Sequence, residues 1–158
     1  MRHIAAIGAV ALSLASPAAA SQWKLISAGR DDAGHYLIFG DRESIKVTAP
    51  KMRRMWIVMV RAHPSKLGDV STKQLDEIDC GQDRVRSLSI NAASETGEIL
   101  YSKSEVGEWQ LVPPDTYGQS EEHAACVGFP QSSFTLDDPI VQGRRLLLGE
   151  DPLSGPAH

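Results

Sequence analysis

The chain after residue 20 begins with alternating apolar and polar positions, which is the pattern of half-buried β-strands. Residues 22–28 alternate in this way, residues 35–39 do so again, and the polar stretch 29–34 between them begins and ends with glycine. Gly29 and Gly34 supply the permissive backbone dihedrals that a short connection needs. The pattern therefore predicts a β-hairpin at the start of the folded region.

Residues 53–62 form the most strand-like segment, because both of their alternating faces are apolar. One face carries Trp56, Val58 and Val60, and the other carries Met55, Ile57 and Met59. A strand that is apolar on both sides belongs in the middle of a sheet that other elements cover.

Further strands are expected at residues 84–92, 98–103 and 109–112. The periodicity of residues 72–79 fits a helix and a strand equally well, so the sequence leaves this segment open. Strand follows strand through short connections, and no strand–helix–strand crossover is visible before the last third of the chain. This order predicts an antiparallel sheet of about six strands.

Helix signals appear only towards the C-terminus. Thr116 and Gln119 have the spacing of a capping box, which predicts a helix from about Tyr117 to Cys126. The apolar face of this helix is thin, so its docking needs further support. A second short helix is predicted by an N-cap residue, a first-turn proline and a terminating glycine at Asp138, Pro139 and Gly149.

The first twenty residues have the features of a signal peptide. An apolar run from Ile4 to Ala15 precedes the small residues Ala18, Ala19 and Ala20, which a signal peptidase recognises. The run is shorter than the roughly 20 residues of a membrane-crossing helix, and no cysteine near Ala20 can accept a lipid. We expect cleavage near Ala20, a product without a membrane anchor, and a periplasmic or secreted location. We expect a signal peptide at 1–20 and a main domain at 21–128. An extension with a short helix and a frayed tail is expected at 129–158.

Export changes how Cys80 and Cys126 are interpreted. An oxidising compartment favours a disulfide where the cytosol would favour thiols or metal ligation. A bridge would remove loop-closure entropy from the unfolded chain and would pin the end of the first helix to the sheet. We predict a Cys80–Cys126 disulfide, and the alternative is a pair of buried free thiols. A catalytic thiol is not expected, because neither cysteine lies in a CxxC pair or a recognisable nucleophile context. The fold class is therefore α+β, an antiparallel sheet with a C-terminal helix docked on one face by a disulfide.

Composition and charge exclude several functions. Sixteen Lys and Arg against 20 Asp and Glu give a net charge of −4, which argues against nucleic acid as a partner. His35, His63 and His123 lack the spacing that would place two imidazoles on one ion, and they are interpreted as surface or partly buried histidines. No serine lies in a nucleophile elbow, and no glycine-rich loop is placed to cradle phosphate. The sequence predicts no catalysis, no cofactor and no metal site.

Two groups of charged residues have both a functional and a structural interpretation. Asp76, Glu77 and Asp79 could act as an acid and a base or as calcium ligands, but the ligand order of an EF-hand is missing. We therefore interpret them as a solvated strand edge. A partner contact is predicted at the arginines that flank the central strand: Arg53, Arg54 and Arg61. Charges at strand ends usually serve solubility and edge protection, which is the structural alternative. The tryptophans, one per strand, are interpreted as core residues: Trp23, Trp56 and Trp109.

A set of structural residues between Gln22 and Val127 resembles the surface-adhesin protein E family. The resemblance lies in Trp23-Lys24-Leu25-Ile26, Trp56 after a Ser44-Ile45 turn, Asp79-Cys80, Leu88-Ser89, Gly107-Glu108-Trp109, Pro113-Pro114, and a helix that ends in Ala125-Cys126. It implies an antiparallel sheet of about six strands with a helix held on one face by the two cysteines. It also implies a homodimer and binding to host proteins such as laminin, vitronectin and plasminogen.

The expected function is an exported, non-catalytic interaction module that binds another protein through a sheet face or edge. The alternative is a soluble periplasmic accessory or inhibitor domain with a bacterial target, which the missing lipid-acceptor cysteine suggests. The expected partner is accordingly a host matrix protein, a periplasmic protein or a second copy of the chain.

Overall fold

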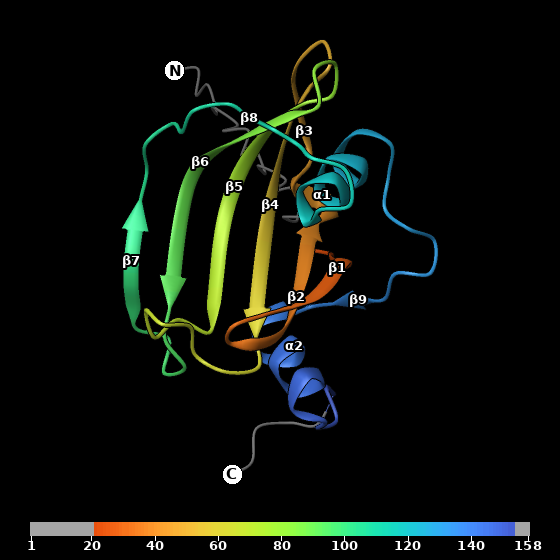
Figure 1. The fold of residues 1–158 in the computed structure, drawn as a ribbon. Coiled ribbons are helices and arrows are strands. Elements are labelled where there is room, and N and C mark those ends of the chain that lie inside the picture. Colours follow the sequence, from red (N-terminus) through yellow and green to blue (C-terminus); the bar gives the residue numbers. More distant parts are fainter. Residues whose placement is uncertain (1–20, 154–158) are drawn as a thin grey trace, which may run out of the picture.

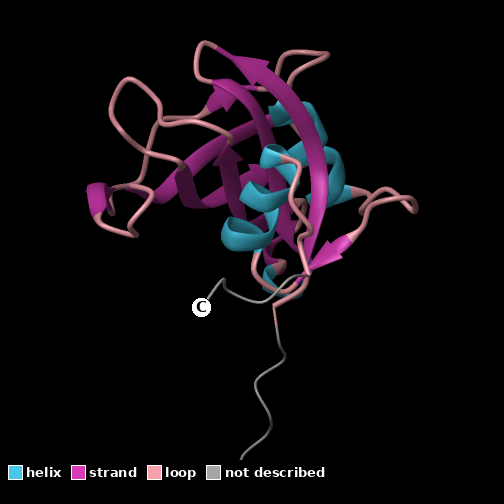
Figure 2. Ribbon diagram, turned by 90° about the horizontal axis from the view of Figure 1, so that it is seen from below, coloured by secondary structure: helices cyan, strands magenta, loops and turns pink. Residues whose placement is uncertain are grey.

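An antiparallel sheet of nine strands forms the body of the described chain (Figure 1). The structure is a computed structural model that describes residues 21–153, so the predicted signal peptide and the end of the predicted frayed tail lie outside this range. The strands are β1 (Trp23–Asp31), β2 (Gly34–Asp41), β3 (Lys46–Ala49), β4 (Met52–Arg61), β5 (Ser71–Asp79), β6 (Arg84–Ala93), β7 (Ile99–Lys103), β8 (Gln110–Leu111) and β9 (Thr135–Leu136). Seen from below, the sheet is curved rather than flat (Figure 2).

The strand order is β7-β6-β5-β4-β2-β1-β9, with β3 paired to β4 and β8 paired to β6. The predicted antiparallel sheet and the central position of residues 53–62 are confirmed. The predicted number of strands was too low. The open segment 72–79 belongs to β5, and the short strands β3 and β9 carry too little periodic pattern to be recognised from sequence.

The first hairpin is tighter than predicted. Asp31 pairs with Gly34, so only two residues separate β1 from β2, and Gly34 has a φ of +105° that suits glycine. Gly29 is not in the turn but pairs with Tyr36 inside the ladder. A Cβ at Gly29 would overlap the Tyr36 ring, so this glycine makes room for a neighbouring aromatic side chain.

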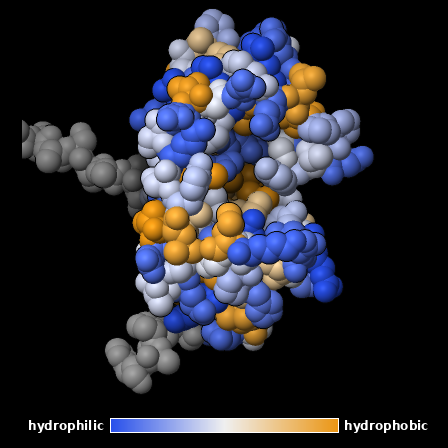
Figure 3. Space-filling view, turned by 60° about the vertical axis from the view of Figure 1, so that its left-hand side comes forward, coloured by the Kyte–Doolittle hydropathy of each residue, from blue (hydrophilic) through white to orange (hydrophobic). Residues whose placement is uncertain are grey.

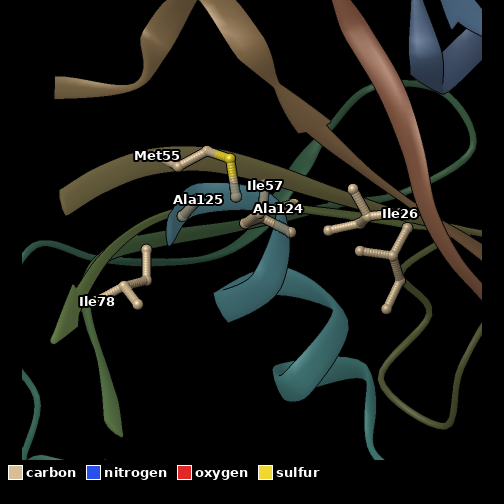
Figure 4. Packing of buried hydrophobic residues seen from close by; sticks show 7 residues of the cluster. Ile26, Met55, Ile57, Ile78, Ala124 and Ala125 are labelled. Carbon is tan, nitrogen blue, oxygen red and sulfur yellow. The ribbon is translucent and has the colours of Figure 1, made fainter. Parts of the chain in front are cut away.

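Apolar side chains alternate along β4 and β2 and build one core on each face of the sheet. One core contains Ile26, Ile38, Met55, Ile57, Ile78, Ala124 and Ala125 (Figure 4). The other contains Trp23, Phe39, Val58, Val60 and Leu136. The predicted burial of β4 on both faces is thus confirmed.

The two helices cover opposite faces of the sheet. Helix α1 (Tyr117–Cys126) supplies the alanines of the first core, and α2 (Pro139–Leu148) packs Ile140, Leu146 and Leu147 on the second. A Cβ at Gly143 would lie 3.1 Å from the Phe39 ring, so glycine lets α2 approach the sheet closely. Neither helix in the described part of the chain has the length and apolar surface that a membrane crossing requires.

Both predicted helix starts are confirmed. Thr116 Oγ1 accepts the backbone N–H of Gln119, as a capping box requires, but Gln119 Oε1 accepts the N–H of Asp115 rather than that of Thr116. The Asp138 carboxylate accepts the N–H groups of Ile140 and Val141, and α2 ends at Gly149 in the left-handed conformation.

The predicted disulfide is confirmed. Cys80 follows the last residue of β5 and Cys126 is the last residue of α1, with Cα atoms 5.8 Å apart. The bridge attaches the C-terminal end of α1 to the sheet, where the buried residues of the helix are two alanines and Glu121. Such a small apolar contact contributes little, so the bridge is the main restraint on the helix.

Loss of this bridge should destabilise the domain strongly. We expect the Cys80→Ser/Cys126→Ser variant to lose about 4 kcal/mol of unfolding free energy, because the bridge joins residues 46 positions apart. Urea unfolding of residues 21–158, with and without reductant, measures this loss. Reductant should leave the double variant unchanged, and equal stability of wild type and variant would contradict the expectation.

Candidate protein-binding site

A groove of about 780 Å³ lies at the end of the sheet that α1 leaves uncovered. Its floor comes from Ile90, Ala92 and Tyr101, and its wall comes from the loop between β4 and β5, including Pro64 and Leu67. Figure 3 shows apolar side chains around a hollow on the side of the molecule that includes β7. The surface is concave and largely apolar, as a binding surface for a protein segment would be.

Arg61 at the end of β4 holds two turns together at the rim of this groove. Its Nη1 lies 3.0 Å from Asp69 Oδ2 in the β4–β5 loop, and its Nε lies 3.3 Å from Asp31 Oδ2 at the β1–β2 turn. Ser65 donates its hydroxyl to Asp69 and so closes the loop on itself. The ion pairs of Arg61 therefore give the groove wall its shape.

Strand β7 forms one edge of the sheet beside the groove. Among the described residues it pairs only with β6, so the backbone groups on its outer side have no partner strand. All five of its residues are exposed, and three of them are large and apolar: Ile99, Leu100 and Tyr101. An exposed apolar edge strand is a template for pairing with another chain.

The three arginines predicted as a partner contact do not form one patch. Arg54 lies on the α2 face of β4, where its Nε is 2.9 Å from Glu77 Oε1. Arg53 lies on the opposite face and donates to the carbonyl of Met52, and Arg61 lies at the other end of the strand. Of the three, Arg61 lies at the groove, and its role as a partner contact stays a prediction.

The interpretation of Asp76, Glu77 and Asp79 as a solvated edge was wrong. All three are buried, because β5 is a central strand whose two faces are both covered. Glu77 and Asp79 face β6 arginines and pair with Arg86 and Arg84, respectively. Asp76 faces the other way, towards Glu121 of α1.

Glu77 is the centre of a charged layer on the α2 face. Burial opposes its ionisation, but hydrogen bonds and charge from Arg86 and Arg54 outweigh burial and lower the pKa of its carboxyl. The Trp109 ring covers this layer, with the guanidinium carbons of Arg84 and Arg86 4.6 and 4.4 Å from its centroid. The charged groups of this layer pair with one another, and these pairs stabilise the sheet.

Of the predicted core tryptophans, Trp23 is buried, whereas Trp56 and Trp109 are only half-buried. The ammonium of Lys73 lies 5.3 Å from the Trp23 ring centroid and 5.2 Å from the Trp56 ring centroid. This face of the sheet is thus covered by cations stacked on aromatic rings rather than by apolar packing alone.

Residues 21–153 contain no cluster of three or more His, Cys, Asp or Glu side chains that could hold a metal ion. His35, His63 and His123 all lie exposed, on β2, in the β4–β5 loop and on α1. The arrangement offers a groove and an open strand edge for binding.

These features define a disulfide-stabilised α+β domain with a mainly antiparallel sheet. The sequence profile of the surface-adhesin protein E family matches residues 23–127, and the chain belongs to this family. Protein E of Haemophilus influenzae, in its crystal form II, is similar in structure, with a TM-score of 0.49, 15% identity, and coverage of 77% of this chain and 98% of that chain. A search of curated proteins found no match.

Glu77 gives a test of the charged layer. We expect Glu77→Gln to lower the free energy of unfolding by about 1 to 3 kcal/mol, because Arg54 and Arg86 lose their shared anion. The lowered pKa of Glu77 means that its stabilisation is full above the ordinary value of 4.5 and is lost as pH falls through the folded value. The difference between wild type and variant should therefore shrink in acid.

Urea unfolding at several pH values measures this difference. Glu98→Gln, which removes an exposed carboxyl, serves as the matched control and should change stability by less than about 0.5 kcal/mol. A Glu77→Gln variant as stable as wild type at neutral pH would show that the layer contributes nothing.

Proposed function

We propose that this chain is an exported, non-catalytic module that binds another protein at the β7 edge and the adjoining groove. The observation that carries the proposal is the exposure of Ile99, Leu100 and Tyr101 on an edge strand beside an apolar groove. Membership in the surface-adhesin protein E family supports a binding role.

The geometry of β7 suits an extended partner segment. Such a segment can add to the outer side of β7 through main-chain hydrogen bonds, with alternate side chains directed towards the groove. The groove floor is apolar, whereas the charges at its rim largely neutralise one another through the pairs Arg61–Asp31, Arg61–Asp69 and Lys66–Asp32. We therefore expect the partner to supply apolar side chains rather than a cluster of one charge.

Binding to host matrix proteins is the first test. Immobilised mature chain should bind purified laminin or vitronectin saturably, and Tyr101→Ala should weaken that binding at least about tenfold, because Tyr101 joins the groove floor to the edge strand. Biolayer interferometry at a fixed salt concentration measures both affinities.

Val47→Ala is the matched control, because Val47 is also exposed on a short strand but lies on β3, away from the groove. Equal weakening by both variants would argue against β7 as the contact. Absence of binding to any matrix protein at micromolar concentration, together with recovery of the chain only in the osmotic-shock fraction, would favour a periplasmic target instead.

A further inference from the structure

Helix α1 is held unequally at its two ends. Its C-terminal end is bonded covalently through Cys126, next to the buried Ala124 and Ala125. Its N-terminal half has a single buried residue, Glu121, which is 2% exposed. Glu121 therefore makes the one buried contact of this half with the sheet, beside the partly exposed Tyr117.

Glu121 meets a second buried carboxyl, that of Asp76 on β5, which is also 2% exposed. Asp76 Oδ2 accepts the side-chain N–H of Gln74 at 2.6 Å. Asp76 Oδ1 and Glu121 Oε1 are buried and find no donor among the described residues. Two carboxylates cannot bond each other, but with one proton between them they form an O–H···O hydrogen bond that satisfies both oxygens.

None of the described cations forms an ion pair with Asp76 or Glu121 that would replace that proton. Tyr117 of α1 and Tyr36 of β2 lie nearby, and the core beneath the helix is apolar. Ser87 stands opposite Asp76 on β6, and Glu108 adds a further carboxyl to the cavity wall. Arg86, on the same strand, also lines the cavity that Asp76 and Glu121 line, but its guanidinium is paired with the Glu77 carboxylate.

We propose that Asp76 and Glu121 form a proton-dependent latch that holds the N-terminal half of α1 on the sheet. With one proton, the pair closes the contact. Without it, two like charges face each other in a buried site and push the helix start away, while the disulfide keeps the helix end attached. The latch is inferred from these two buried carboxyls, whichever partner binds in the groove.

The buried position of both groups favours the protonated state. Burial raises the pKa of Glu121 well above its ordinary value, and the neighbouring charge of Asp76 raises it further. Burial also raises the pKa of Asp76. The pair therefore stabilises the fold fully below the unfolded values of 3.8 and 4.5, and this stabilisation is lost as pH rises through the folded pKa of Glu121.

Release of the helix start would enlarge the groove. A cavity of about 340 Å³ lies between α1, β5, β6 and the segment before α1, and it is lined by Asp76, Glu121 and Tyr117. A smaller pocket of about 230 Å³ shares Tyr117 and Gln74 with this cavity, and Thr72 and Ile90 with the groove. Tyr117 thus stands between the groove and the latch, and it moves with the helix.

The test is hydrogen exchange of the α1 amides in the mature, disulfide-bonded chain as a function of pH. Wild type and Glu121→Gln are compared at each pH, so that the intrinsic exchange rate cancels. We expect the amides of residues 120–123 to become less protected in wild type as pH rises, by about tenfold per unit of pKa difference at the latch, whereas those of Glu121→Gln stay protected. The glutamine side chain that replaces Glu121 in this variant carries an N–H that can donate to Asp76 without titrating.

Glu122→Gln is the matched control, because it removes the adjacent, only half-buried carboxyl and should leave the pH dependence as in wild type. Carbon NMR of the two carboxyls provides a second measurement, which should show Glu121 titrating above 4.5. If Glu121→Gln fails to fold, Asp76→Asn takes its place, with the same loss of pH dependence expected.

Two results would overturn the latch. One is parallel loss of protection with pH in wild type and both latch variants. The other is ordinary titration of both Asp76 and Glu121 in the folded chain. Neither result bears on partner binding at β7, which is measured separately.

Discussion

The disulfide between Cys80 and Cys126 is the constraint on which the placement of α1 depends. The helix brings only two alanines and one glutamate into buried contact, so apolar burial alone holds it weakly. A covalent bond at the last helical residue removes most of the freedom of that end. It also decides which part of the sheet α1 covers, and hence which part stays open as the groove over Ile90, Ala92 and Tyr101.

Strand β5 shows how a charged sequence can occupy the centre of a sheet. Asp76 and Glu77 are neighbours in sequence, so their side chains lie on opposite faces of the sheet. Their buried carboxyls are stabilised in different ways on the two faces. Glu77 pairs with two arginines, which lower the pKa of its carboxyl and keep it ionised. Asp76 has another carboxyl, an amide and a hydroxyl beside it but no paired cation, so its burial raises the pKa of its carboxyl and favours a proton. The same residue chemistry therefore yields a salt-bridged layer on one side and a protonated contact on the other.

The elements with strong local signals were predictable from sequence. These elements are the apolar faces of β4, the caps at Thr116 and Asp138, and the cysteine pair in a chain that is predicted to be exported. Each depends on neighbouring residues or on the expected compartment. Burial of the β5 carboxylates was not predictable in this way, because it depends on which strands flank β5. A partial signal was present: Arg84 and Arg86 repeat the two-residue spacing of Glu77 and Asp79. The groove was missed because the β4–β5 loop, which forms its wall, has no periodic pattern.

The part of the sheet around β7 is open because neither helix extends over it. Helix α2 packs over β2 and β4, and α1 packs over β1, β2, β4 and part of β6 from the other side. Strand β7 and the part of β6 that pairs with it therefore extend beyond both helices. A sheet face beyond its covering helices must be made polar or be covered by something else. On the α2 side, Arg84, Arg86 and Trp109 make it polar. On the α1 side, Ile90, Ala92 and Tyr101 remain apolar beside an unpaired strand edge, which is the arrangement that a partner strand would complete.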